Sequence, residues 1–160
     1  MTKGYRPNVG MMIINSEKKV LLGLRMRSEN LTYRFQMPQG GIDKGEKPIE
    51  AVYREMYEEV GLRHEDVRFI ASTRHWYKYD LPETARKKRT IRGQRQKWYL
   101  FLLVADENHI NLKTDKIQEF EDYQWFDLED IMETVIPFKR TVYEQVIKEF
   151  RPFIEHLKTN

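Results

Sequence analysis

The chain contains no cysteine. This absence excludes a disulfide framework, a zinc site built from thiolates and a cysteine nucleophile, and it fits a reducing compartment, so we expect a cytoplasmic protein. Long hydrophobic runs are also missing. The longest one near the N-terminus, residues 9–14, is far too short to cross a membrane, and no signal-peptide pattern precedes it, so we expect no membrane association.

A strong charge of one sign is missing as well, because 28 Lys and Arg residues against 25 Asp and Glu residues leave a net charge of only +3. That value alone does not predict nucleic-acid binding. What the chain does have is material for one core: its 160 residues are 40% hydrophobic and 12% aromatic, which argues against disorder. We expect a single domain spanning residues 1–160 and, by default, a monomer.

Charge is distributed unevenly along the chain. Residues 85–97 (ARKKRTIRGQRQK) carry seven cations and no acid, whereas residues 40–65 contain a cluster of glutamates. A protein arranged in this way can hold a cation at one place and an anion at another. The alternative is that the basic run is simply a solvated loop.

Apolar and β-branched segments separated by turn residues predict a set of strands. The predicted strands are residues 8–14, 18–24, 67–79, 98–105 and 123–126. Loops are expected over residues 25–33 and 85–97. A small helix should open at Asp127, and a C-terminal helix should follow Pro137, with Pro152 kinking or ending it. Strands and helices mix without strict alternation, which favours a mixed sheet with helices on both faces.

Residues 48–60 have the pattern of an amphipathic helix. Pro48 suits the first helical turn, where a missing N–H costs nothing, and Gly61 suits a left-handed cap at the end. One face is apolar at spacings of three, four and four residues, through Ile49, Val52, Met56 and Val60.

Three carboxylates share the edge of this predicted helix. At 100° per residue, Glu55, Glu58 and Glu59 fall within an arc of about 100° beside the apolar stripe, whereas Arg54 points to the other side. Like charges this close raise one another's pKa unless a cation neutralises them. Oxygen-only ligands favour Mg²⁺ or Mn²⁺ over Zn²⁺. The alternative is an ordinary solvated acidic face.

A magnesium site beside a basic surface suits phosphoanhydride substrates. Mg²⁺ bridges phosphate oxygens and makes a bound water more acidic, while Lys and Arg stabilise the charge that develops on phosphorus oxygens. The acidic helix and the basic segment are therefore the two candidate halves of one site.

The segment Gly40–Leu62, GGIDKGEKPIEAVYREMYEEVGL, resembles the Nudix box, G-x5-E-x7-R-E-U-x-E-E-x-G-U, in which U is apolar. The fixed positions are filled by Gly40, Glu46, Arg54, Glu55, Glu58, Glu59 and Gly61, and the apolar ones by Met56 and Leu62. The resemblance implies an α/β protein, a Nudix-type α/β/α sandwich with a mixed β-sheet. It also implies a Mg²⁺- or Mn²⁺-dependent hydrolase that cleaves a nucleoside diphosphate linked to another group.

The resemblance extends over about residues 4–150. Four further segments are similar to the subfamily that contains bacterial RNA pyrophosphohydrolases and dinucleoside polyphosphate hydrolases: residues 4–10, 36–41, 93–98 and 138–140. Two departures lie where a base would stack. The loop between Arg25 and Phe35 is longer than usual, and Met37 stands where an aromatic residue is usual.

The resemblance implies roles for individual residues. Glu55, Glu58 and Glu59 would bind metals, one of them taking the proton of the attacking water, and Glu119 would be a distal metal ligand. Arg54 would position a glutamate, Gly40 would let the backbone approach the metal site, and Glu46 would pin the loop to the helix. Arg6 would reach the triphosphate, and Arg25, Gln94, Phe138 and Lys139 would contact the terminal nucleotides.

Ordinary structural roles compete with several of these. Arg6 could be a surface arginine, Phe138 a core residue of the C-terminal helix and Glu119 a solvated acid at a strand edge. The three tryptophans, Trp76, Trp98 and Trp125, lie in strand-like segments and are expected in the core rather than as base platforms.

Two enzymatic functions fit the resemblance. One is removal of pyrophosphate from the 5′ triphosphate end of RNA, which leaves a monophosphate and promotes mRNA decay. The other is cleavage of a dinucleoside polyphosphate such as diadenosine tetraphosphate into ATP and AMP. The basic 85–97 segment favours RNA, because a cationic loop can follow the phosphates of a polynucleotide. A non-catalytic RNA-binding module of the same fold is a third possibility, against which the intact glutamates argue.

Overall fold

The computed structural model describes residues 4–26, 32–86, 88 and 90–158. Residues 27–31 of the predicted loop 25–33 and residues 87 and 89 of the basic segment therefore lie outside the described residues. The strands are β1 Tyr5–Ile14, β2 Val20–Arg25, β3 Phe35–Gln36, β4 Gln39–Gly41, β5 Val67–Ser72, β6 Tyr77–Asp80, β7 Gly93–Leu103 and β8 Phe120–Phe126. The α-helices are α1 Pro48–Val60, α2 Ile131–Thr134 and α3 Arg140–Glu155. The 3₁₀ turns are η1 His64–Asp66, η2 Glu83–Ala85, η3 Glu107–His109, η4 Leu128–Asp130 and η5 Pro137–Lys139.

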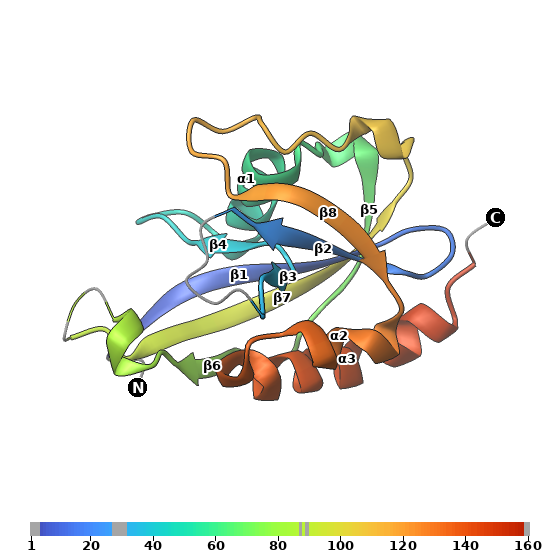
Figure 1. The fold of residues 1–160 in the computed structure, drawn as a ribbon. Helices are drawn as coiled ribbons and strands as arrows, with labels where there is room; N and C mark the ends of the chain where they lie inside the picture. Colours follow the sequence, from blue (N-terminus) through green and yellow to red (C-terminus); the bar gives the residue numbers. More distant parts are fainter. Residues whose placement is uncertain (1–3, 27–31, 87, 89, 159–160) are drawn as a thin grey trace.

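The strands form a mixed sheet, as the sequence predicts. Its main path runs in the order β3-β2-β1-β7-β5, with β4 added to β1, β6 to β7 and β8 to β2. The long central pair, β1 and β7, is parallel, and the other strand pairs are antiparallel. In Figure 1 α1 lies on one side of the sheet and α2 and α3 lie on the other. The expected layered α/β architecture is confirmed.

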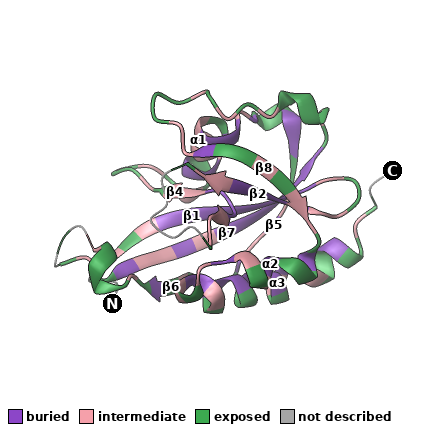
Figure 2. Ribbon diagram, in the orientation of Figure 1, coloured by how far each residue is buried: buried purple, intermediate pink, exposed green. Residues whose placement is uncertain are grey.

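The two central strands are buried on both faces, which is why they read as nearly continuous apolar runs. Alternate residues along each strand serve different cores. Met12, Ile14, Trp98 and Leu100 join the cluster under α3, whereas Val9, Met11, Ile13, Tyr99 and Phe101 join the cluster under α1. Figure 2 shows the same arrangement, with buried strands between helices that are exposed on their outer sides.

Between residues 67 and 97 the predicted elements are wrong in two places. The expected strand 67–79 is two strands, β5 and β6, because β5 carries a register shift between Phe69 and Ala71 and because Glu149 of α3 accepts a hydrogen bond from the Arg74 backbone N–H at 2.7 Å. The expected loop 85–97 ends early, since β7 already begins at Gly93 and pairs with β1 from Tyr5 onward.

Some predictions for single residues also fail. Ile49 is 38% exposed, since the buried cluster begins at Ala51 and the first turn of α1 extends past it. Trp98 is fully buried as expected, but Trp76 is 37% exposed and lies under the Arg95 guanidinium. Pro152 lies inside α3 and does not end it.

The helix α3 continues through Pro152 because buried residues anchor it on both sides of the proline. Phe150 precedes Pro152 and Ile154 follows it, and both pack into the cluster beneath α3. None of the helices within the described ranges is long and apolar enough to cross a membrane.

Candidate active site

The helix α1 has the predicted bounds because both of its ends are capped. The Glu50 carboxylate accepts the Lys47 backbone N–H at 2.9 Å, and Pro48 occupies the first turn. At the other end Gly61 adopts a left-handed backbone with φ of 75° and donates its N–H to the Tyr57 carbonyl. The capped ends thereby fix the position of the glutamates in the last two turns of α1 relative to β4.

Glu55 packs directly onto the β4 backbone. A Cβ atom at Gly40 would overlap the carboxyl carbon and both carboxyl oxygens of Glu55. Burial raises the pKa of Glu55 to about 7, and this rise is only partly opposed by the hydrogen bond from Arg54. Glycine at position 40 is therefore what allows the β4 backbone and the Glu55 carboxyl group to lie this close together.

Gly40→Ala is therefore expected to displace the Glu55 carboxyl group and to lower turnover on the order of tenfold, since small displacements of catalytic groups carry large rate costs. Gly41→Ala is the matched control, because no atom lies within 4 Å of a Cβ atom built at Gly41. Steady-state rates and thermal unfolding of both variants provide the measurement. Equal turnover in the two variants would contradict a role for this contact.

Glu59 is the most deeply buried of the three helical carboxylates. Its residue is 9% exposed, and its Oε1 accepts the Gln39 backbone N–H at 3.2 Å. Burial raises the pKa of Glu59 well above its usual range, and the charges of Glu55 and Glu119 raise it further. Glu119 is distant in sequence, but its negative charge lies close enough to the Glu59 carboxyl group to raise the pKa of Glu59.

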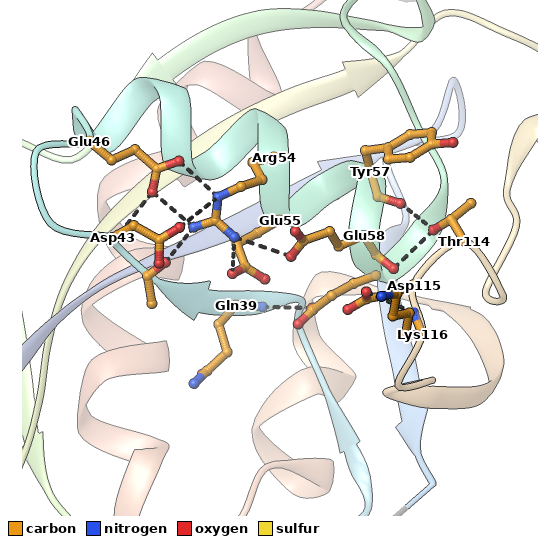
Figure 3. Close-up of polar contacts among 12 residues, drawn as sticks. Gln39, Asp43, Glu46, Arg54, Glu55, Tyr57, Glu58, Thr114, Asp115 and Lys116 are labelled. Carbon is orange, nitrogen blue, oxygen red and sulfur yellow. Dashed lines mark hydrogen bonds and ion pairs between the residues drawn. The ribbon is translucent and has the colours of Figure 1, made fainter.

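Arg54 lies on the same side as the carboxylates, so the prediction that it points away is wrong. Its Nη1 donates to Glu55 at 2.8 Å and to Glu58 at 3.1 Å, as Figure 3 shows. Its Nε and Nη2 donate to the two oxygens of Glu46, and Nη2 also donates to the Gly41 carbonyl. One guanidinium therefore ties the loop before α1 to two glutamates of the helix.

Glu46 holds the other end of this arrangement. Hydrogen bonds from Arg54 lower the pKa of Glu46 to about 2, and its Oε1 also accepts the backbone N–H of Asp43 at 2.9 Å. The carboxylate is thus an ionised anchor between loop and helix. Its contacts link the backbone at Asp43 in the loop to Arg54 of the helix.

The carboxylate group has the donor chemistry of a site for a hard divalent cation. All candidate ligands are carboxylate oxygens, and burial raises the pKa values of both Glu55 and Glu59. Within the part of the chain that the structure describes, no three acidic or histidine side chains are arranged as a ready-made metal site. Glu55 and Glu58 instead both accept hydrogen bonds from Arg54.

Gln39 connects the carboxylates to a polar network on the α3 side of the sheet. While its backbone bonds Glu59, its side-chain oxygen accepts from Lys139 at 3.3 Å and from Gln96 at 3.2 Å. Its amide nitrogen donates to Gln94 at 3.2 Å. Gln39 thus contacts both Glu59, a predicted metal ligand, and Lys139, a predicted nucleotide contact.

Lys139 is more enclosed than expected for a residue that contacts a nucleotide. It is 6% exposed, and its ammonium donates to Gln36 at 3.0 Å. Burial lowers the pKa of Lys139 to about 7, and the positive charge of Arg25 lowers it further. Arg25 and Lys139 are therefore neighbours, although the sequence separates them widely.

The remaining predicted substrate residues lie around the same network. Phe138 is half-buried, with its ring 5.7 Å from that of Tyr79, and the Tyr79 hydroxyl donates to Gln94 at 2.6 Å. Arg6 is exposed and paired with Gln94 in the parallel β1–β7 ladder. The structure thus brings Arg25, Gln94, Phe138 and Lys139 together, with Arg6 next to Gln94.

Sequence reasoning missed the residues that link the two sides. Gln39 belongs to the segment 36–41 and Tyr79 to the predicted strand 67–79, but the sequence predicts no site role for either residue. For Gln39, its position between Pro38 and the glycine turn was a usable signal, since a side chain at that point must lie beside the carboxylate helix. For Tyr79 we find no comparable signal.

The chain is similar to known proteins over most of its length. A family model described as the NUDIX domain matches residues 4–146. The chain is 44% identical over 155 residues to a protein named RNA pyrophosphohydrolase from Aliivibrio fischeri (strain MJ11), with 92% of this chain and 86% of that protein covered. It is 41% identical over 153 residues to a protein of the same name from Francisella tularensis subsp. mediasiatica, with 94% and 96% covered.

Solved structures show the same fold at low sequence identity. The E. coli dihydroneopterin triphosphate pyrophosphohydrolase superposes with a TM-score of 0.70 at 18% identity, covering 91% of this chain and 98% of that one. The C. elegans Ap4A hydrolase superposes with a TM-score of 0.64 at 17% identity, covering 94% and 98%. At these identities the likeness concerns the fold alone.

Proposed function

The chain belongs to the NUDIX family, and from this premise we propose that it is an RNA pyrophosphohydrolase, which removes pyrophosphate from the 5′ triphosphate end of RNA and leaves a 5′ monophosphate. The observation that carries the proposal is the near full-length likeness, at 41–44% identity, to proteins of that name. The intact glutamate cluster supports an enzyme over a binding module, because binding alone does not require acids that repel one another.

Glu55, Glu58 and Glu59, with Glu119, would hold the Mg²⁺ or Mn²⁺ that the family resemblance implies. When bound, the cation would neutralise phosphate charge and make a water molecule more acidic. The fit rests on the all-oxygen donor set and on the raised pKa values of Glu55 and Glu59. Arg54 would then keep Glu55 and Glu58 oriented from the loop side, as its hydrogen bonds to both already do.

Protons can be handled by the chain's own carboxyl groups. One of the glutamates at the end of α1 would take the proton of the attacking water as a general base. The Gln39 N–H holds Glu59 in a fixed orientation beside Glu55. Glu55 and Glu59 thus place two carboxyl groups side by side at the end of α1, and Glu59 is held in a fixed orientation.

The network around Gln39 supports a nucleotide on the α3 side. Arg25 supplies positive charge there, beside the buried Lys139, and the half-buried Phe138, packed on Tyr79, supplies an aromatic face against which a base can stack. Arg6, exposed at the start of β1, would reach the triphosphate. The proposal includes a monomer in the cytoplasm, where the RNA substrate occurs and where a cysteine-free chain fits the reducing conditions.

The test compares two substrates at matched concentrations with Mg²⁺: a 5′-triphosphorylated RNA and diadenosine tetraphosphate. We expect release of pyrophosphate and 5′-monophosphorylated RNA as the faster reaction. The Glu59→Gln variant serves as the blank for contaminating phosphatases. Formation of ATP and AMP from the dinucleotide, without pyrophosphate from RNA, would instead establish the dinucleoside polyphosphate hydrolase.

A further inference from the structure

The connection from β7 to β8, residues 104–119, packs against the C-terminal end of α1. The Asn111 backbone N–H donates to the Val60 carbonyl at 2.8 Å, and a Cβ atom at Gly61 would lie 2.8 Å from Asn111. The residues on either side of Asn111 are apolar and pack against the cluster under α1. The connection therefore covers the end of the helix that carries the glutamates, and in Figure 1 it passes α1 before it enters β8.

Thr114 provides a second attachment to the same helix end. Its hydroxyl oxygen lies 2.5 Å from the Tyr57 carbonyl oxygen and 3.0 Å from the Glu58 carbonyl oxygen, and Figure 3 shows both contacts. The single hydroxyl proton is therefore shared between two carbonyls, as is common at the ends of helices. Thr114 is half-buried, whereas its neighbours Lys113 and Asp115 are exposed. Of these three side chains, the one that meets the helix is the hydroxyl.

Hydrogen-bond donors at this end of α1 have an electrostatic role. The last carbonyls of a helix have no partners within it, and they carry the negative end of the helix dipole. Glu58 and Glu59 add two carboxylates to the same turn, and residues 57–60 include no base. The Thr114 hydroxyl and the Asn111 N–H therefore bring positive partial charge to a turn that is otherwise negative.

The same connection carries Glu119, five residues after Thr114. The Glu119 carbonyl accepts the Met26 backbone N–H at 2.9 Å, so the Glu119 backbone is attached just beyond the end of β2. Its carboxylate lies near Glu59, since its charge raises the pKa of that group. Residues 115–117, between the two attachments, are all exposed. The course of this short segment therefore depends on the attachments at its two ends.

We propose that Thr114 is a positioning residue for the metal site: its hydroxyl fastens the β7–β8 connection to the end of α1 and so keeps the Glu119 carboxylate beside that of Glu59. The inference rests on the proposed function for the cation that these carboxylates would hold. It gives the hydroxyl no contact with RNA or with the reacting phosphates. Without the hydroxyl, Glu119 stays attached near β2 but is free to move away from Glu59, so a bound cation is held less tightly.

The first test removes the hydroxyl with Thr114→Val, which keeps the shape of the side chain. Binding of Mn²⁺ without RNA, followed by electron paramagnetic resonance, should weaken about tenfold, at the lower end of the effect of residues that orient metal ligands. Thr114→Ser keeps the hydroxyl and should bind Mn²⁺ as wild type does. Wild-type affinity in Thr114→Val, or no recovery in Thr114→Ser, would overturn the inference.

Thr134→Val is the matched control for the loss of a hydroxyl group. The Thr134 hydroxyl also donates to a backbone carbonyl, that of Ile131 at 2.8 Å, but it does so in α2 on the other side of the sheet. Its removal should leave Mn²⁺ binding unchanged. A loss of Mn²⁺ affinity in Thr134→Val equal to that in Thr114→Val would show a general effect of destabilisation and overturn the inference.

A double-mutant cycle shows whether the effect of Thr114 passes through Glu119. In a Glu119→Gln background, Thr114→Val should cause no further loss of Mn²⁺ affinity, because the carboxylate that the hydroxyl positions is already gone. A tenfold loss in both backgrounds would overturn the inference, since Thr114 would then act on the helix itself and not on Glu119.

Turnover separates this inference from the proposed function. With 5′-triphosphorylated RNA, Thr114→Val should require about tenfold more Mg²⁺ for half-maximal rate and should approach the wild-type kcat at saturating Mg²⁺. If the Mn²⁺ results hold but wild-type protein releases no pyrophosphate from RNA, the proposed function fails and the inference stands. If wild-type protein releases pyrophosphate but Thr114→Val has an unchanged requirement for Mg²⁺, the inference fails and the proposed function stands.

Discussion

Glu59→Gln is expected to lower turnover at least about 100-fold, which corresponds to about 2.7 kcal/mol of transition-state stabilisation. Glutamine has the same shape, and its carbonyl oxygen can still accept the Gln39 N–H, so the local structure should persist. What is lost is the negative charge that would attract a divalent cation. Steady-state kinetics with triphosphorylated RNA over a range of Mg²⁺ concentrations is the measurement.

The melting temperature of Glu59→Gln distinguishes the loss of the negative charge from misfolding of the variant. Because burial raises the pKa of Glu59, its ionised form costs folding free energy as pH rises through that value, and glutamine removes this cost. At pH 8 without divalent cations, Glu59→Gln should therefore melt at the same temperature as wild type or higher. Glu65→Gln, at an exposed glutamate just after α1, is the control and should change neither the turnover nor the melting temperature. Wild-type turnover in Glu59→Gln would remove Glu59 from the catalytic group.

Arg54→Lys is expected to lower activity between about 10- and 100-fold, the usual effect of losing a residue that orients metal ligands. A lysine ammonium cannot reproduce the guanidinium that bonds Glu46, Glu55 and the Gly41 carbonyl together. We also expect the free energy of unfolding to fall by about 2 kcal/mol, since charge-assisted hydrogen bonds are lost at a partly buried site. Activity titrated with Mg²⁺ and chemical denaturation are the two measurements.

The matched control for Arg54→Lys is Arg63→Lys. The Arg63 guanidinium lies over the Tyr57 ring, away from the carboxylates, so its replacement should leave the Mg²⁺ titration unchanged. If Arg54→Lys loses stability but keeps wild-type activity per folded molecule, Arg54 is structural only and does not orient the glutamates.

The best-predicted parts of the molecule are those whose signals are local. The bounds of α1 follow from Pro48 at one end and Gly61 at the other, both of which act through their own backbone geometry. The grouping of Glu55 and Glu59 follows from helical spacing alone. Such features need no knowledge of what the rest of the chain does.

The failures arise where distant residues decide the outcome. A helical wheel gives the direction of each Cβ atom but not the reach of a long side chain, so it placed Arg54 on the wrong side of α1. The break between β5 and β6 depends on Glu149 of α3, which bonds the backbone of Arg74. The burial of Lys139 depends on Gln36 and Gln39, which are brought to it by the fold.

The parallel pairing of β1 with β7 also affects how the molecule comes into being. It joins residues 5–14 to residues 93–102, and these two strands also pair with β2, β4, β5 and β6. Closing so long a stretch of chain costs entropy before any contact rewards it, and such non-local pairings slow folding. During synthesis, β1 and the glutamate helix α1 therefore leave the ribosome well before β7 does, and Arg6 cannot meet Gln94 until most of the chain has been translated.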